Sequence, residues 1–443
     1  MASIAFISLG CDKNTVDAEK MAAKLMQAGH CIVDSAGEAD VTVVNTCAFV
    51  ESAREESIGW ILQAAERKKE GRTAALVVTG CLAERYRDQV TEEFPELDAV
   101  VVLSGNASIV GVIEDVLRGK RVILTQTAGG PDESGGRHLL TPAHYAYLKI
   151  AEGCDNHCTF CSIPAIRGRY RSRPTRDIVA EAQSLVRGGV KELILVAQDT
   201  TSYGRDLGLQ SGLAVLVEQL AALDGLWKVR LLYAYPEYFD DELIRVMAAN
   251  HVIARYADIP FQHADDEMLR RMGRRTTAQK MVELIEKLQR AMPDIVLRSS
   301  FIVGFPGETE AQFMKLFELT RRGITRGGSF IYSAEEGTPA AGMAGQIGAG
   351  KKQRRYEQFE LFQSRLLSNW LQARIGSRMQ VICDGTETTE CGEQVISCRS
   401  EYDAPDVDTR ILLPADCGLR AGQLAMVEIT GCDGFDLTAS LAN

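Results

Sequence analysis

Short runs of β-branched and apolar residues alternate with amphipathic stretches from the first residue to about residue 120. This alternation limits the fold more than any other feature, because parallel strands need long crossover connections that are usually helices. It predicts an α/β domain built on a doubly wound parallel sheet. The expected strands are residues 2–9, 41–45, 74–79 and 99–103, and the expected helices are 16–28, one ending at 65, 82–90 and one ending near 119.

The alternation resumes near residue 144 with longer units. Six parallel strands separated by helical patterns predict a partial (β/α)6 barrel, which is shorter than the usual eight units. A further helix is expected over residues 351–372. The expected barrel strands are 146–151, 192–197, 228–233, 256–261, 295–303 and 328–333.

Short strands with turn signals follow residue 375, at 379–383, 394–399, 409–413 and 424–431. They predict a small all-β barrel. Residues 121–143 are rich in glycine and are expected to form a linker or an exposed hairpin. The chain is therefore divided into an N-terminal domain (1–120), the linker (121–143), a central domain (144–372) and a C-terminal domain (374–443).

The chain contains twelve cysteines. No apolar run reaches ~18 residues, so no transmembrane helix is expected. The first seven residues have no basic region and resemble a strand more than a signal peptide, which favours a cytoplasmic location. Since disulfides are disfavoured in the cytosol, metal binding or redox chemistry is the leading explanation for the cysteines, and burial as small apolar side chains is the alternative.

Cys154, Cys158 and Cys161 form a C-x3-C-x2-C run directly after the first expected barrel strand. In a barrel this loop lies at the carboxyl end of the strands, where active sites are found. Three thiolates can hold three irons of a [4Fe–4S] cluster and leave the fourth iron open to an outside ligand. A zinc site is the alternative, but zinc needs four ligands and His157 is too close in the chain to complete the set easily.

Cys11, Cys47 and Cys81 each follow an expected strand of the N-terminal sheet at near-equal spacing. The carboxyl ends of parallel strands share one edge of the sheet, where α/β proteins bind ligands. The three thiols are therefore expected to converge as a second cluster site, again with an open iron. Coincidence of three unrelated cysteines is the alternative.

The C-x3-C-x2-C run resembles the radical S-adenosylmethionine superfamily. The resemblance implies that the open iron chelates S-adenosylmethionine and that an electron from the cluster yields a 5′-deoxyadenosyl radical. It also suggests cofactor contacts at Gly188, Gly189, Gly304 and Glu308, although these could be helix caps or plain turns. No catalytic residue is assigned, because the radical would take the substrate hydrogen without a general base.

Several motifs together resemble the methylthiotransferase family over essentially the whole chain, with a TRAM-like C-terminal barrel. They are SLGCDKNTVD (8–17), NTCAF (45–49) and TGC (79–81), beside the barrel cysteines. The resemblance implies methylthio insertion at an unactivated carbon–hydrogen bond. One S-adenosylmethionine would supply the methyl group and another the radical, while the N-terminal cluster holds the sulfur.

Four further stretches resemble the RimO-type branch, which modifies the β-carbon of an aspartate in the twelfth protein of the small ribosomal subunit. They are AQDTTSYG (197–204), LYAYP (232–236), DIPFQHA (258–264) and YSAEEGT (332–338). Asp12 departs from the family pattern, where proline is expected. The alternatives are a tRNA adenosine 2-methylthiotransferase and a two-cluster electron carrier.

Charge gives an independent indication of the partner. The net charge is −11, and the segment from Arg374 to the end holds 12 acidic and 5 basic residues. Such a domain would repel phosphates and attract a basic ribosomal protein, so nucleic acid is not expected as the main substrate. A solvated acidic surface is the alternative. Flavodoxin or ferredoxin is the expected electron donor.

Two arginine-rich stretches point the other way, because RNA-binding segments can mix arginine with aromatic residues. They are residues 167–173 and the group Arg270, Arg271, Arg274 and Arg275. Local ion pairs or an exposed helix end would explain them equally well. His263 is expected to end a barrel strand and face the site, in a structural or a ligand-contacting role.

The remaining cysteines have no ligand spacing. A zinc site among them is conceivable, and inert thiols are the simpler explanation. They are Cys31, Cys383, Cys391, Cys398, Cys417 and Cys432.

Overall fold

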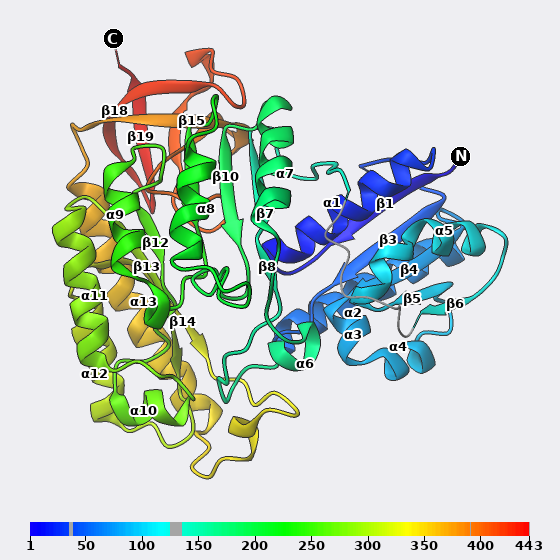
Figure 1. The fold of residues 1–443 in the computed structure, drawn as a ribbon, viewed down its shortest axis with the longest axis horizontal. Coiled ribbons are helices and arrows are strands. Elements are labelled where there is room, and N and C mark those ends of the chain that lie inside the picture. The colour runs from blue at the N-terminus through cyan, green and yellow to red at the C-terminus, as the bar shows by residue number, and fades with distance from the viewer. Residues whose placement is uncertain (35–38, 125–134, 390, 443) are drawn as a thin grey trace.

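The computed structural model describes residues 1–34, 39–124, 135–389 and 391–442. Its ribbon shows the N-terminal sheet beside the central barrel, with the C-terminal barrel packed at one end of the central strands (Figure 1). None of the described helices is both long and apolar enough to cross a bilayer.

The N-terminal sheet has six parallel strands in the order β2-β1-β3-β4-β5-β6, which confirms the doubly wound α/β architecture. Apolar residues of α1 and α5 pack on one face, and those of α2 and α3 on the other. The elements are β1 Ser3–Ser8, α1 Asp12–Gln27, β2 Cys31–Ile32, β3 Val41–Thr46, α2 Glu51–Lys69, β4 Ala75–Gly80, α3 Cys81–Arg85, α4 Arg87–Glu93, β5 Ala99–Val101, η1 Leu103–Ser108, α5 Ile109–Leu117 and β6 Val122–Leu124.

Three details differ from the sequence expectation. The helix expected over 82–90 is divided at Tyr86, which leaves the helical region (φ −127°, ψ 31°). Strands β2 and β6 are two and three residues long, too short to produce a periodic pattern. Because β6 pairs with β5, the sheet extends into the range assigned to the linker. The GGP stretch of that range falls outside the described residues.

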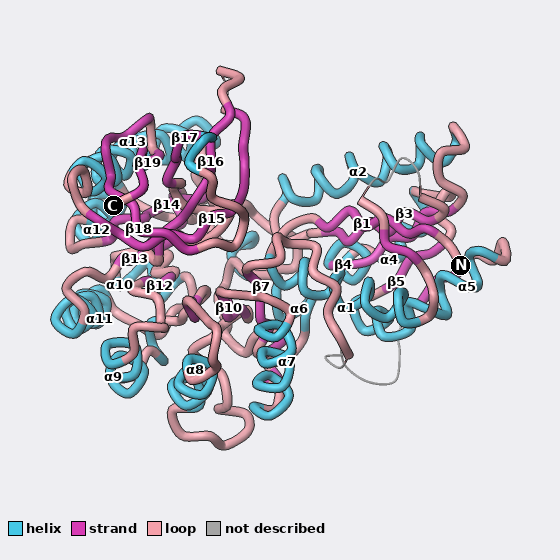
Figure 2. Tube along the Cα trace, turned by 90° about the horizontal axis from the view of Figure 1, so that it is seen from above, coloured by secondary structure: helices cyan, strands magenta, loops and turns pink. Residues whose placement is uncertain are grey.

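The central domain has six parallel strands with helices on the outside (Figure 2). They form two sheets, β11-β10-β7 and β12-β13-β14, with a single parallel bridge between Val229 and Ile253 at the seam. The strands are β7 Tyr145–Lys149, β10 Glu192–Val196, β11 Lys228–Leu231, β12 Tyr256–Asp258, β13 Val296–Val303 and β14 Ile324–Ile331. The last begins four residues before its predicted start, because Gly327 and Gly328 interrupt its apolar pattern.

The other elements of this domain are β8 Ala151–Glu152, α6 Ile163–Arg167, β9 Arg171–Ser172, α7 Thr175–Arg187, α8 Gly212–Ala221, η2 Pro236–Tyr238, α9 Asp241–Ala249, α10 Asp266–Arg271, α11 Ala278–Ala291, α12 Glu310–Thr320, η3 Pro339–Gly342 and α13 Ala349–Gln372.

The C-terminal domain is a closed five-stranded barrel in the order β15-β16-β17-β19-β18, as the turn-rich sequence predicted. The last strand was missed because the two-residue turn at Gly434 and Phe435 joins it to its neighbour as a hairpin. The elements are β15 Arg378–Thr388, β16 Gln394–Ser400, β17 Ile411–Pro414, η4 Ala415–Cys417, β18 Leu424–Asp433 and β19 Asp436–Leu441.

A buried ion triplet fastens this barrel to the central strands. The carboxylate of Glu192, fully buried at the start of β10, accepts from Arg230 Nε at 2.7 Å and from Arg399 of β16. Burial alone would raise the pKa of Glu192, but the charges of Arg399 and Arg230 outweigh it and hold the pKa below its ordinary value. One carboxylate therefore pairs with two buried arginines across the interface, and Arg399 has a second partner in Asp384 at 3.0 Å.

The loop from Glu401 to Asp408 faces the same interface. Asp403 pairs with Arg326 of β14, and Asp408 accepts from the hydroxyl of Tyr256 at 2.6 Å. Part of the acidic excess of the C-terminal domain thus compensates basic and phenolic groups inside the protein. The acidic excess of this domain that is free to attract a basic partner is therefore smaller than the sequence count suggested.

We predict that Glu192→Gln destabilises the protein by about 3–5 kcal/mol, because it removes the ion-pair partner of the buried Arg230 and leaves the buried Arg399 with Asp384 alone. Thermal and denaturant unfolding of the full chain would measure this. The lowered pKa means that the carboxylate stabilises the fold at neutral pH and loses this effect as the pH falls, so the difference from wild type should shrink in acid.

Glu393→Gln is the matched control, since Glu393 is an exposed glutamate of the same domain. It should change stability by less than about 0.5 kcal/mol. Equal effects of the two substitutions would contradict the role assigned to Glu192.

Candidate functional site

The cysteines of the central domain lie in one loop between β8 and α6, at the carboxyl end of β7. Cys158 Sγ is 3.5 Å from the hydroxyl oxygen of Tyr235 and 3.9 Å from Nη1 of Arg274. Tyr235 follows β11 and therefore reaches the loop from a second strand end. The guanidinium of Arg274 lies 3.6 Å from the centre of the Tyr235 ring. Arg274 is buried, so it is not part of an exposed helix end.

Burial raises the pKa of Cys154 to about 11 and that of Cys161 to about 12, and the neighbouring thiols contribute to both shifts. The three sulfurs are thus close enough to influence one another. Thiols of this kind are protonated at neutral pH unless a metal centre displaces the proton, because only the thiolate is a metal ligand.

The N-terminal cysteines converge from three loops at one edge of the sheet. Cys11 precedes α1, Cys47 follows β3 and Cys81 opens α3 directly after β4. Gly10 and Gly80, which precede two of them, have φ angles of +89° and +94°. These left-handed conformations suit glycine because it lacks a Cβ.

The close approach of these loops also requires glycine. A Cβ on Gly10 would lie 2.6 Å from Cys47 Cβ and 2.8 Å from Cys47 Sγ, and one on Gly80 would lie 2.4 Å from the carbonyl oxygen of Thr46. The two glycines therefore permit the contact that brings the first and third cysteine loops onto the second.

Asn14 ties the three loops together, although the sequence did not single it out. Its Nδ2 donates to the carbonyl oxygens of Leu9 at 2.8 Å and Thr46 at 2.9 Å. Its Oδ1 lies 3.8 Å from Cys81 Sγ. The amide of one buried residue thus contacts the segments that carry Cys11, Cys47 and Cys81.

Each donor set is compatible with a metal cluster. Within the described ranges, no three Cys, His, Asp or Glu side chains are arranged to bind one metal ion. A [4Fe–4S] cluster needs no such closeness, since each thiolate binds a different iron. Burial raises the pKa of Cys47 and raises that of Cys81 to about 12, with the other N-terminal thiols adding to both shifts, so three neighbouring thiolates there need cationic compensation.

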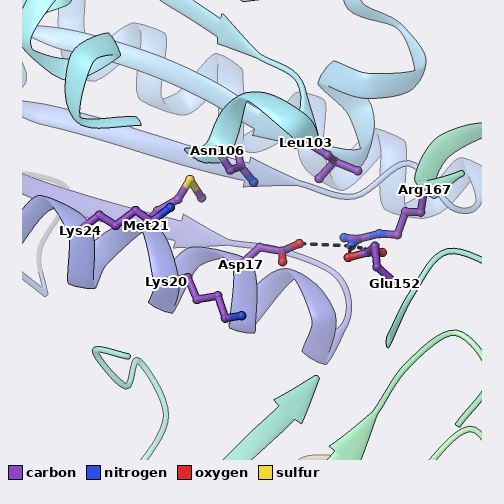
Figure 3. Close-up of a pocket in the computed structure, with 8 residues that line it drawn as sticks. All are labelled: Asp17, Lys20, Met21, Lys24, Leu103, Asn106, Glu152 and Arg167. Atoms are coloured by element: carbon purple, nitrogen blue, oxygen red, sulfur yellow. Dashed lines mark hydrogen bonds and ion pairs between the residues drawn. The ribbon is translucent and has the colours of Figure 1, made fainter. Parts of the chain in front are cut away.

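A buried ion-pair network connects the two cysteine sites. Glu152, two residues before Cys154, pairs with Arg167 of α6 at 3.0 Å, and Arg167 Nη1 also lies 3.2 Å from Asp17 of α1. Arg167 Nη2 donates to Asn14 Oδ1 at 2.5 Å. Asp17, Glu152 and Arg167 line a narrow pocket with room for about one water molecule (Figure 3). The network joins the barrel loop to the helix that follows Cys11.

A second contact links the domains on the other side. Glu335, in the loop after β14, pairs with Arg54 of α2 at 2.6 Å and with Arg85 of α3 at 3.1 Å. Arg85 also donates to the carbonyl oxygen of Ala48, next to Cys47. Glu335 lies in the YSAEEGT stretch, but no sequence pattern indicates its pairing with Arg54 and Arg85, because they belong to another domain.

The expected cofactor contacts at Gly188 and Gly189 fall elsewhere. Gly188 caps α7, and Gly189 (φ +103°) forms the turn before β10. Since β7 and β10 are parallel, this turn is at the opposite strand end from the Cys154 loop. The helix-cap alternative accounts for both glycines, and they are not part of the candidate site.

Gly304 and Glu308 lie at the correct end, directly after β13. The buried carboxylate of Glu308 accepts from Gly304 N at 2.7 Å and from Arg355 Nη1 at 2.6 Å, and its other oxygen is 3.1 Å from His263 Nε2. Both oxygens are thus engaged by the protein itself. Glu308 and His263 hold the loop in place, while Gly304 remains a candidate contact.

The arginine-rich segment 167–173 is largely engaged in ion pairs within the protein. Arg173 pairs with Glu181 at 2.5 Å and Arg169 with Asp155 at 2.6 Å, beside the buried Arg167. Such a segment offers little free positive charge to a phosphate backbone.

The remaining cysteines lie apart from both sites. Cys383 and Cys398 are buried cross-strand neighbours inside the C-terminal barrel, and Cys31 and Cys391 are exposed.

We predict that Gly10→Ala removes about four of about eight irons from the reconstituted protein, because its Cβ would push Cys47 out of place. Gly29→Ala is the control: Gly29 has the same φ of +89° but open space around its Cβ. Iron and acid-labile sulfide analysis would compare them. Full iron in both variants would show that the approach of Gly10 to Cys47 is not needed for the cluster.

Family models match three consecutive parts of the chain. The radical SAM superfamily matches residues 148–320, the uncharacterized protein family UPF0004 matches 3–102, and the TRAM domain matches 375–441. Among solved structures, the radical S-adenosylmethionine methyltransferase TsrM from Kitasatospora setae is similar in fold, with a TM-score of 0.55 and 14% identity over 76% of this chain and 73% of that one.

Curated relatives match along the whole chain. The ribosomal protein uS12 methylthiotransferase RimO of Desulforamulus reducens is 44% identical over 100% of both chains. The enzymes of the same name from Desulforudis audaxviator and Geobacter sulfurreducens are 45% and 42% identical, over 98% and 99% of this chain and 96% and 98% of theirs. The chain belongs to the RimO family of methylthiotransferases within the radical SAM superfamily.

Proposed function

We propose that this enzyme inserts a methylthio group at the β-carbon of an aspartate in ribosomal protein uS12. The observation that carries the proposal is the convergence of Cys11, Cys47 and Cys81 at a sheet edge tied by buried ion pairs to the barrel loop of the other three cysteines. Family membership supplies the reaction and the substrate class.

Each of the two three-cysteine sites would have its own role in the reaction. Cys154, Cys158 and Cys161 would hold the [4Fe–4S] cluster that, when bound, supplies the electron for cleaving S-adenosylmethionine. Cys11, Cys47 and Cys81 would hold a second cluster, which supplies the position for the sulfur to be transferred.

The protein's own side chains prepare these sites. Arg274 brings a buried positive charge to Cys158 Sγ. Tyr235 directs its hydroxyl at the same sulfur. Asn14 fixes the N-terminal loops, and Arg167 connects them to the barrel. Gly304 lies at the strand ends where S-adenosylmethionine would bind.

The partners follow from this assignment. We propose a basic small-subunit ribosomal protein as the substrate, a flavodoxin or ferredoxin as the electron donor and the cytoplasm as the location. A tRNA substrate is less favoured, because the arginine-rich segment after the barrel cysteines is engaged in internal ion pairs. An electron carrier would have no use for irons left without a protein ligand.

We predict about eight irons and eight acid-labile sulfides per chain after anaerobic reconstitution. Replacing Cys154, Cys158 and Cys161 by alanine, or replacing Cys11, Cys47 and Cys81, should each leave about half. A yield of about four irons that is insensitive to the N-terminal substitutions would refute the second cluster and with it the sulfur-insertion mechanism.

The substrate is tested with the reconstituted enzyme, S-adenosylmethionine, a reductant and either uS12 or tRNA. Mass spectrometry should show the mass of one methylthio group on an aspartate of uS12 and none on tRNA. Modification of tRNA alone would overturn the choice of substrate while leaving the reaction type intact.

A further inference from the structure

Lys13 is a nearly buried lysine that forms no ion pair with the described residues. Only 6% of the residue is exposed. Among the described residues, no carboxylate lies within ion-pair distance of its Nζ, and no hydrogen bond from this atom is found. It makes a cation–π contact with the ring of Tyr233, whose centre lies 3.3 Å from Nζ. Buried lysines are normally paired, so this ammonium has an unused capacity to bind an anion.

The position of Lys13 is between the two cysteine sites. It lies two residues after Cys11, at the start of α1. Tyr233 is at the carboxyl end of β11, and Tyr235, two residues further on, contacts Cys158 Sγ. The hydroxyl of Tyr233 donates to Asp12 Oδ2 at 2.9 Å. The short segment from Tyr233 to Tyr235 therefore reaches from the Cys11 loop to Cys158. The ammonium of Lys13 lies over the Tyr233 ring of this segment.

The neighbouring acids are hydrogen-bonded to Tyr233, and Lys13 acts on Asp258 only through its charge, which opposes the rise in the pKa of Asp258 that burial causes. Asp12 accepts from Tyr233, and Asp258 accepts from the backbone N–H of Tyr233 at 3.0 Å. Tyr233 itself has a left-handed backbone (φ +59°), which is unfavourable for a bulky residue and is often found where a functional site over-determines the conformation. The tyrosine is thus held from both ends beneath the ammonium.

We propose that Lys13 binds the side-chain carboxylate of the aspartate that the enzyme modifies. This inference rests on the proposed function. The carboxylate is bonded directly to the β-carbon that reacts, so an ion pair with Lys13 would fix this carbon between the two cysteine sites. An asparagine at the same position could accept a hydrogen bond from Lys13 but could not form an ion pair with it, and Lys13 would therefore favour aspartate.

The test is a double-mutant cycle on binding. The reconstituted holoenzyme, as wild type or Lys13→Met, is titrated with uS12 and with a uS12 variant whose target aspartate is replaced by asparagine. Charge-assisted hydrogen bonds are worth about 1.5–3 kcal/mol, or about ten- to a hundredfold in affinity. We expect wild type to bind the aspartate form at least about tenfold more tightly than the asparagine form, and Lys13→Met to bind both alike.

Lys24→Met is the control, since Lys24 is on the same helix but in its last turn. It should keep the wild-type preference for aspartate, and Lys13→Arg should keep part of it. Iron content identifies any variant that fails to assemble its clusters. The wild-type comparison of the two uS12 forms needs no enzyme variant, so the inference remains testable if Lys13→Met does not fold.

Equal affinity of wild type for the two uS12 forms, or an equal loss for both in Lys13→Met, would overturn the role of Lys13. Neither result would touch the proposed function if wild type still methylthiolates uS12. Failure of wild type to modify uS12 at all would instead refute the proposed function itself.

Discussion

The buried ion pairs of Arg167 are the contact on which the arrangement of the site depends. This guanidinium reaches Glu152 beside the barrel cysteines, Asp17 on the first helix and Asn14 among the N-terminal loops. Other contacts between these domains support it, among them the pair of Lys149 with Asp17 and the contacts around Glu335 and Tyr233. The network therefore sets how one cysteine site faces the other.

Burying such a network costs free energy, and it contributes more to a specific arrangement of the domains than to stability. Taking charges out of water costs several kcal/mol per ion, which the mutual attraction only partly repays. A packed apolar interface could bind the domains as tightly, but it would allow small shifts of one domain relative to the other, because apolar contacts are not directional. Lys149 pairs with both Asp17 and Glu152, so the cations and carboxylates form a closed set with directional bonds. A directional interface suits an enzyme that must present one carbon to two reactive centres.

The same principle appears at the other end of the barrel. Glu192 compensates Arg230 and Arg399, and the loop around Asp403 and Asp408 joins the C-terminal barrel to the central strands. Acidic residues that the composition suggested as a recognition surface are in part structural. The substrate-selecting charge that the geometry favours is instead the single ammonium of Lys13.

The sequence by itself predicted most of the strands and helices, the three architectures and the grouping of the cysteines into two sets, because periodicity and the position of a residue after a strand are local properties. Parallel pairing then brings strand ends together without further information, which is why Cys11, Cys47 and Cys81 could be grouped. Tertiary structure alone decided the roles of Asn14 and Lys13, since these depend on contacts between segments far apart in the chain. It also removed Gly188 and Gly189 from the site, because the strand end at which a turn lies is visible only once helix and strand boundaries are fixed.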